Sequence, residues 1–157
     1  MISQREIVAI TLWWAEGTKS RRDKRWKNAV SYPVEVTNTN PAIIKIFVDY
    51  LLLDLGIPKD KLRVQIQTHE GDDTERIERF WSGVTGVSRQ NFNKTIVRPA
   101  GSKPGKSAGT CKVRFADKVT YKLLCSRLEA ALLGVHNHPE QALQLYEPGQ
   151  SSPYLLE

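Results

Sequence analysis

The chain has 157 residues, a net charge of +6 and a hydrophobic fraction of 40%, which is the size and composition of one globular domain. Its longest apolar run, Ile43 to Leu53, is broken by Lys45 and Asp49, so we expect no membrane span and no membrane partner. The first residues do not show the hydrophobic run and cleavage site of a secretory signal. Cys111 and Cys125 lack metal-ligand spacing and are predicted to be reduced core thiols of a cytoplasmic protein.

The positive charge is concentrated in two segments. Between Gly17 and Lys27 six residues are cationic and Asp23 is the single acid, and between Val87 and Ala116 seven are cationic and none is acidic. Acidic residues gather elsewhere, as in the segment from His69 to Glu78. This separation is typical of a surface that binds a polyanion, most commonly nucleic acid. A basic face that serves only solubility is the alternative.

The N-terminal elements are predicted to be a helix and two strands. Arg5 to Ala15 is expected to be helical, because apolar residues recur at spacings of three and four; they are Ile7, Val8, Leu12, Trp13 and Ala15. The two strands are placed at residues 19–27 and 30–37, the second because it is rich in β-branched and aromatic residues.

A second helix is predicted from Pro41 to about Leu55, with Asn40 as its N-cap and proline at its first position. Gly56 ends this helix and Pro58 prevents it from resuming.

The segment from Lys61 to His69 alternates strictly, which predicts a half-buried strand. Leu62, Val64, Ile66 and Thr68 form one face, and the other carries long polar side chains without a carboxylate: Lys61, Arg63, Gln65, Gln67 and His69. Arginine and glutamine pair with guanine and adenine edges in a major groove. This face is therefore predicted to contact DNA, with Arg63 able to read guanine, and the alternative is an ordinary solvated sheet face.

The C-terminal half is predicted to contain a helix, a hairpin and a last helix. The first helix spans Thr74 to Val84 and buries Ile77, Phe80, Trp81 and Val84. Residues 91–98 and 110–116 are predicted to form a β-hairpin joined by the loop PAGSKPGKSAG. The last helix runs from about residue 117 to 133. We therefore expect one domain over residues 1–134 and a polar tail over residues 135–157, ordered only where it packs or pairs.

Other catalytic constellations are poorly supported. The chain has no glycine loop of the phosphate-binding kind, and His69, His136 and His138 lie near no candidate nucleophile in the sequence. The letters HNH at residues 136–138 match a nuclease motif, but that motif needs histidines spread through a metal-binding fold. Here they precede a proline in the tail, which favours coincidence.

The sequence AITLWWAEG, from Ala9 to Gly17, resembles the nine-residue helix motif of the LAGLIDADG homing endonucleases. Glu16 occupies the acidic position that binds metal in that family, Gly17 the closing glycine, and Ala15 the small residue before the acid. The order of predicted elements over residues 5–133 also resembles the family's core. The resemblance implies an α+β fold with an αββαββα core and a curved antiparallel sheet, with one extra helix and a C-terminal tail.

Two features depart from the family pattern. Thr11 stands where a glycine is usual, and Trp13 and Trp14 are bulkier than the usual residues, so they are expected to face the chain's own core. Only one copy of the motif is present, because the last helix has Leu133 where a second copy would need an acid.

In this family two motif helices pack together and place their carboxylates beneath the DNA. One motif per chain therefore implies a homodimer on a near-palindromic site in double-stranded DNA. The resemblance implies that Glu16 and Gly17 hold Mg²⁺ or another divalent cation. Thr11 and Ala15, four residues apart, would allow the two helices to approach closely.

The resemblance also implies residues that support catalysis, for which Lys94, Lys112 and Gln67 are the candidates beside Glu16. The residues expected to contact DNA are the cations and amides of the basic segments and of the alternating strand: Lys19, Arg21, Arg22, Lys24, Arg25, Lys27, Lys61, Arg63, Gln65, Gln67, Arg98, Lys103, Lys106 and Arg114.

The sequence thus predicts a homodimeric, metal-dependent endonuclease of double-stranded DNA, with no small-molecule substrate. The alternative is a LAGLIDADG-like DNA-binding protein or transcriptional regulator without cleavage. Glu16 favours the enzyme, whereas Thr11 in place of glycine favours the regulator. An RNA-binding or maturase-like relative fits the same charge.

Overall fold

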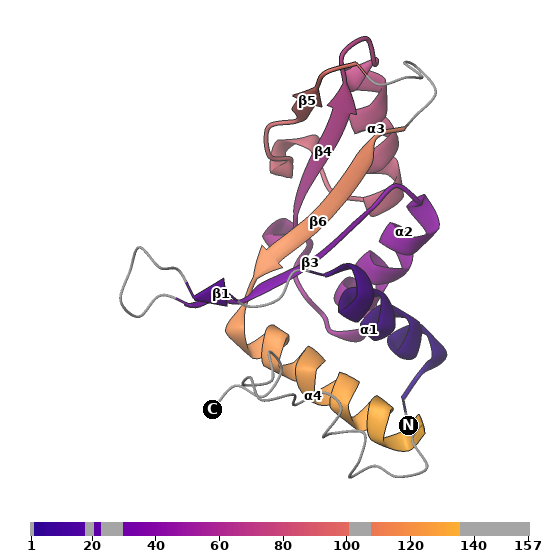
Figure 1. Cartoon of the computed structure of the whole chain (residues 1–157), viewed down its shortest axis with the longest axis vertical. Coiled ribbons are helices and arrows are strands. Elements are labelled where there is room, and N and C mark those ends of the chain that lie inside the picture. The colour runs from indigo at the N-terminus through magenta and orange to yellow at the C-terminus, as the bar shows by residue number, and fades with distance from the viewer. Residues whose placement is uncertain (1, 18–20, 23–29, 101–107, 136–157) are drawn as a thin grey trace. The chain divides into compact units, whose positions relative to one another are not determined.

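The computed structural model describes residues 2–17, 21–22, 30–100 and 108–135 (Figure 1). The chain divides into two compact units. Unit 1 comprises Met1–Val34 and Ala116–Glu157, and unit 2 comprises Glu35–Phe115. No helix in the described segments is long and apolar enough to cross a membrane.

Unit 1 is built on two helices that pack together, α1 (Gln4–Glu16) and α4 (Lys118–Val135). They confirm the two helices predicted at these positions. A short antiparallel hairpin joins β1 (Arg21–Arg22) to β2 (Val30–Ser31). This hairpin falls within the two strands predicted from the sequence, although most of the first strand lies outside the described residues.

The helices of unit 1 are held by an aromatic contact and an ion pair. Trp13 is fully buried, and its ring meets that of Tyr121 edge to face with centroids 5.5 Å apart. The Oγ of Ser3 accepts a hydrogen bond from the backbone N–H of Glu6 at 3.1 Å and so caps α1. The carboxylate of Glu6 forms an ion pair of 3.4 Å with Arg127 of α4. Tryptophan burial therefore fixes the face of α1 that packs on α4.

The sheet is four-stranded, open and mixed. Its strands are β3 (Pro33–Asn38), β6 (Thr110–Ala116), β4 (Arg63–His69) and β5 (Ile96–Arg98), in that spatial order. Strand β4 pairs antiparallel with β6 and parallel with β5. The chain is therefore an α+β protein, but the sheet is not purely antiparallel, and that part of the predicted fold is wrong.

Two helices of unit 2 lie on one side of its sheet, α2 (Pro41–Asp49) and α3 (Thr74–Thr85), and they contact each other (Figure 1). One turn of π-helix, Tyr50–Asp54, continues α2, and short 3₁₀ turns occupy Lys59–Lys61 and Arg89–Asn91. This side of the sheet is apolar, because the alternate residues of β4 and β6 that face it are buried.

The ends of these helices follow the capping signals in the sequence. The Oδ1 of Asn40 accepts a hydrogen bond from the N–H of Ala42 at 2.9 Å, as predicted for the N-cap of α2. Gly56 has φ +66° after the π-turn, and Gly86 has the same φ after α3. Both glycines take up the left-handed conformation that commonly ends a helix.

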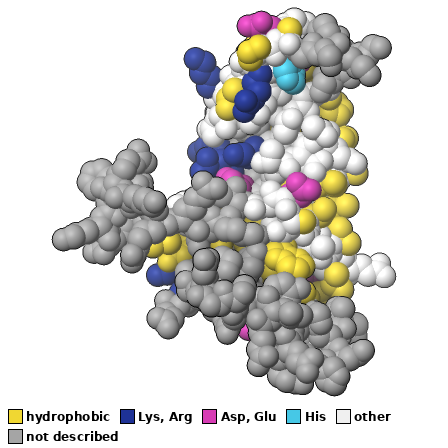
Figure 2. Space-filling model, in the orientation of Figure 1, with side chains coloured by type: hydrophobic (Ala, Val, Ile, Leu, Met, Phe, Trp, Pro, Cys, Tyr) yellow, Lys and Arg dark blue, Asp and Glu magenta, His cyan; other side chains and the backbone are white. Residues whose placement is uncertain are grey.

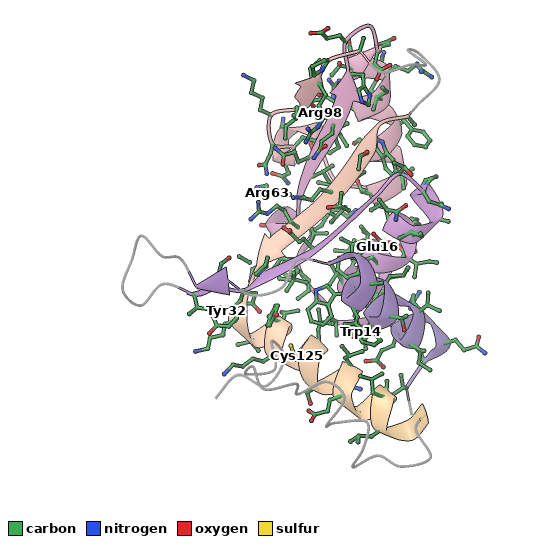
Figure 3. The ribbon with its side chains drawn as sticks, in the orientation of Figure 1. Trp14, Glu16, Tyr32, Arg63, Arg98 and Cys125 are labelled. Carbon is green, nitrogen blue, oxygen red and sulfur yellow. The ribbon has the colours of Figure 1, made fainter. Side chains whose placement is uncertain are left out.

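The core of unit 2 includes a thiol of very low acidity. Cys111 of β6 is fully buried, and this burial raises the pKa of its thiol to about 12. Cys125 of α4, in unit 1, is also buried (Figure 3). The prediction that both residues are core thiols is confirmed.

The predicted hairpin between residues 91–98 and 110–116 is wrong. Strand β5 pairs with β4 on the edge away from β6, and α3 lies between β4 and β5 in the sequence. The three elements form a crossover connection, which places β5 parallel to β4. The segment before β5 also runs alongside β4, as the hydrogen bond from the N–H of Asn93 to the Val64 carbonyl at 2.7 Å shows.

Two side chains are placed differently from the sequence prediction. Lys61 belongs to the 3₁₀ turn before β4 and is not part of the strand. Phe80 is 43% exposed, and the buried residues of α3 are Ile77, Trp81 and Thr85. The predicted helical spacing of apolar residues in α3 is therefore correct, but the buried side of the helix does not include Phe80.

Gly109, directly before β6, is predicted to tolerate no side chain. It has φ +71°, and an added Cβ would lie 2.6 Å from the Gln67 carbonyl oxygen of β4. Gly109→Ala should lower the free energy of unfolding by about 1–3 kcal/mol, because strain and a backbone clash act together. Gly83 in α3 is the matched control, since a Cβ there meets nothing within 4 Å. Gly83→Ala should raise stability by about 0.5–1 kcal/mol through helix propensity. Urea unfolding measures both, and equal effects would contradict this account.

Candidate nucleic-acid interface

The side of the sheet that faces away from α2 and α3 is lined by cations and amides. Arg63, Gln65 and Gln67 of β4 lie opposite Arg114, Lys112 and Thr110 of β6 in register. In the parallel pairing, Ile96 is the partner of Gln67 and Arg98 the partner of His69. Figure 2 shows dark-blue Lys and Arg side chains on this side of the sheet. We call it the polar sheet face, and its polar and charged members include Glu35, Arg63, Gln65, Gln67, Arg98, Thr110, Lys112 and Arg114.

Two arginines are direct cross-strand partners on this face. Like charges placed opposite each other destabilise a sheet, so each guanidinium needs compensation. The Nη1 of Arg63 (Figure 3) donates to the carbonyl oxygens of Asp60 at 2.6 Å and Leu62 at 3.0 Å. Arg114 instead forms an ion pair with Glu35. Each guanidinium therefore has acceptors of its own, and both side chains reach the surface.

Glu35 is a charged residue of the polar sheet face that was not predicted from the sequence. It is only 5% exposed although it belongs to the polar sheet face. Its Oε2 lies 3.5 Å from the Nε of Arg114 and its Oε1 lies 3.9 Å from the Nζ of Lys112. The signal was present in the alternation of Val34, Glu35 and Val36, because both valines are buried in the core. A period of two places Glu35 on the opposite face of the strand.

The two glutamines of β4 have fixed amide orientations. The Nε of Arg98 donates to the Oε1 of Gln67 at 3.1 Å, and the Nε2 of Gln65 donates to the Lys94 carbonyl at 3.3 Å. An arginine can only donate and a carbonyl can only accept, so these partners assign each amide oxygen and nitrogen. Gln67 thus keeps its NH₂ group for a ligand, and Gln65 keeps its carbonyl oxygen.

A pocket of about 520 Å³ lies beside Gln65, lined also by Lys94, Thr95, Ile96 and Val97. One residue of this wall, Thr95, is hydrogen-bonded to Glu78 of α3. The Oγ1 of Thr95 donates to one Glu78 oxygen at 2.5 Å, and the Nη2 of Arg89 donates to the other at 2.8 Å. The pKa of Glu78 is lowered, first by the Thr95 hydrogen bond, which together with Arg89 outweighs desolvation. This carboxylate therefore anchors the segment that carries Lys94.

The structure places the predicted DNA-contacting residues unevenly. Arg63, Gln65, Gln67, Arg98 and Arg114 share the polar sheet face, whereas Lys61 is exposed on the 3₁₀ turn before it. Two of the three candidates for supporting catalysis, Gln67 and Lys112, lie on this face as well, and Lys94 lines the neighbouring pocket. The remaining predicted contacts lie outside the described residues: Lys19, Lys24, Arg25, Lys27, Lys103, Lys106 and the side chains of Arg21 and Arg22.

Glu16 is the last residue of α1 and its side chain is exposed (Figure 3). Gly17 has φ −82°, and its N–H closes the helix on the Trp13 carbonyl at 2.8 Å. Within the described segments, no group of three or more His, Cys, Asp or Glu side chains could hold a metal ion. Glu16 is thus able to supply one carboxylate ligand.

The exposed face of α1 carries apolar as well as polar residues. Thr11 and Ala15 are exposed, as a dimer interface requires, and the Thr11 hydroxyl donates to the Ile7 carbonyl at 2.8 Å. Ile7 and Val8 are 47% and 43% exposed, although they share the helical spacing of the buried Trp13. The buried stripe is instead Glu6, Ala9, Ile10 and Trp13, because the bulk of Trp13 turns it toward α4.

The Glu78 anchor predicts a pH-dependent contribution to stability. Glu78→Gln should lower the free energy of unfolding by about 1–2 kcal/mol near neutral pH, because the hydrogen bonds then lose their charge. The pKa of Glu78 is lowered in the folded chain. Its contribution is therefore complete above the unfolded carboxyl pKa of about 4.3 and is lost as the pH falls through the lower folded pKa.

Urea unfolding of wild type and variant should consequently differ near neutral pH and converge well below about pH 4. Glu75→Gln is the matched control, since Glu75 is 65% exposed and makes ion pairs of 3.8 Å and 3.9 Å only. A Glu78→Gln effect that is the same at both pH values, or equal to that of Glu75→Gln, would show that this carboxylate is not the anchor.

Comparisons of the chain with protein-family models, with curated proteins and with solved structures return no match.

Proposed function

We propose that this chain binds double-stranded DNA through the polar sheet face and, as a homodimer, cleaves it as a LAGLIDADG-like, metal-dependent endonuclease. The observation that carries the proposal is the register of β4 and β6, which aligns Arg63, Gln65 and Gln67 with Arg114, Lys112 and Thr110 on one face. Cations and amides are the side chains that contact phosphates and base edges.

The side chains of this face suit the edges of DNA bases. In the major groove each base pair presents its own pattern of donors and acceptors. The free NH₂ group of Gln67 can donate to a purine N7 or a guanine O6, and the free oxygen of Gln65 can accept from an adenine or cytosine amino group. Arg98 adds positive charge for the phosphates.

Cleavage is assigned to Glu16, which is exposed at the end of α1. Two copies joined along the exposed α1 face, at Thr11 and Ala15, would bring together two carboxylates, the hard oxygen ligands that Mg²⁺ prefers. A bound divalent cation would lower the pKa of a water molecule and neutralise charge on the phosphate. Lys94, Lys112 and Gln67 remain the candidates for steadying that charge or orienting water.

A second candidate function is DNA binding without cleavage. It is favoured by the lack of a three-ligand cluster in the described part of one chain. It is also favoured by Thr11, which is bulkier than the glycine usual at that position of the family motif. The polar sheet face would then have the same role, and the α1 face would serve dimerisation alone.

Glu16→Gln tests the cleavage assignment. The isosteric amide removes one negative charge from the end of α1, so Mg²⁺-dependent nicking of supercoiled plasmid should be lost, by at least about 100-fold, the scale of a lost charge-stabilising group. Duplex affinity should stay within about twofold of wild type, because the polar sheet face is unchanged. Glu75→Gln, an exposed carboxylate of α3, is the control and should cleave like wild type.

The outcomes separate the two candidates. A wild-type chain that binds duplex but never nicks it, with or without Mg²⁺, supports the non-cleaving candidate. A Glu16→Gln variant that cuts as fast as wild type shows that the catalytic assignment is wrong. Failure of the wild type to bind duplex DNA overturns both candidates.

A further inference from the structure

We infer that Glu35 determines the specificity of the polar sheet face, because it holds Lys112 and Arg114 away from DNA phosphates and so limits sequence-independent binding. This inference rests on the proposed DNA-binding function and adds a residue that sets how strongly the face prefers one sequence over another. It is carried by the burial of Glu35 and by its two ion pairs.

Burial makes Glu35 an unusual choice for its position. The residue is 5% exposed in the middle of β3, between two fully buried valines. A buried carboxylate is strongly disfavoured unless cations and hydrogen bonds compensate for its lost hydration. A threonine or valine would suit the strand without that cost. The charge of Glu35 is therefore best explained by what it does to its neighbours.

The geometry divides the carboxylate between two cations. One oxygen is 3.9 Å from Lys112 Nζ and the other is 3.5 Å from Arg114 Nε. Both distances are long for hydrogen bonds, so the attraction is mainly electrostatic. Glu35 has 6% of its side chain exposed, whereas Lys112 and Arg114 have 26% and 41%. The carboxylate therefore lies below the two cations, and the outer atoms of Lys112 and Arg114 remain at the surface.

Phosphates and base edges respond differently to this arrangement. A phosphate competes with Glu35 directly, since both are anions that require the same cation. A base edge is uncharged and can accept a hydrogen bond while the cation stays paired with Glu35. Glu35 therefore weakens the sequence-independent part of binding more than the base-reading part. Lys94 offers a comparison, because it forms no ion pair with any residue in the described segments.

The first test is Glu35→Gln, which keeps the shape of the side chain and removes its charge. Binding of wild type and variant to a short random-sequence duplex is measured over a range of salt concentrations. The slope of log affinity against log salt should steepen by about 0.9 for each cation released. Near physiological salt each released cation should raise random-duplex affinity about fivefold, from that slope. Affinity for a duplex selected with the wild-type chain should rise less, so the ratio of selected to random binding falls.

A second set of variants starts in the wild-type background, where the test does not depend on the folding of Glu35→Gln. In the wild-type background, Lys112→Gln and Arg114→Gln should each reduce the salt slope by clearly less than Lys94→Gln does. The reason is that Lys94, unlike the other two cations, has no carboxylate partner in the described segments. In the Glu35→Gln background, the same two substitutions should reduce the slope by about 0.9 each, as for a full phosphate contact. A structural role for Glu35 alone would change stability but not this pattern.

The failure of the inference is distinct from that of the proposed function. Suppose that the wild type binds duplex with a clear salt slope. If a folded Glu35→Gln variant then keeps the same slope and the same ratio of selected to random binding, the role of Glu35 is overturned while DNA binding stands. Equal slopes for Lys112→Gln, Arg114→Gln and Lys94→Gln in the wild-type background also overturn it. If the wild type shows no salt-dependent duplex binding, the proposed function itself is wrong.

Discussion

The antiparallel register between β4 and β6 is the constraint on which the polar sheet face depends. Val64 pairs with Val113 and Ile66 with Cys111 on the core side, while Gln65 pairs with Lys112 on the other. A slip of one residue would carry the polar side chains into the core and expose the apolar ones, so the burial of the core residues fixes the register strongly. The same burial therefore places cations and amides together outside.

The polar sheet face is refined by contacts that each restrain one side chain. Backbone carbonyls hold Arg63, Glu35 draws Arg114 and Lys112, and Arg98 orients the amide of Gln67. Because Glu35 already engages Lys112 and Arg114, a phosphate must displace this carboxylate to bind either cation. An uncharged base edge can accept a hydrogen bond while both ion pairs stay in place. A face built this way favours discrimination over raw affinity.

Local patterns in the sequence predicted what depends on neighbouring residues, and failed where distant segments meet. The alternation of Arg63, Gln65 and Gln67 identified β4, and Asn40 identified the start of α2. The direction of β5 was missed, because its pairing depends on the α3 crossover and not on its own residues. The ion pairs of Glu35 were missed for the same reason, since their partners lie on β6, far along the chain.

The central claim is that the polar sheet face binds duplex DNA, and backbone amide chemical shifts in a ¹⁵N NMR titration with a short duplex test it most directly. The account predicts that the largest shift changes occur at Gln65, Gln67, Lys112 and Arg114, and that they weaken as salt is raised. The amides of α2 and α3, which cover the opposite side of the sheet, should change little. Shift changes confined to those helices, or absent from β4 and β6 at saturating duplex, would contradict the account.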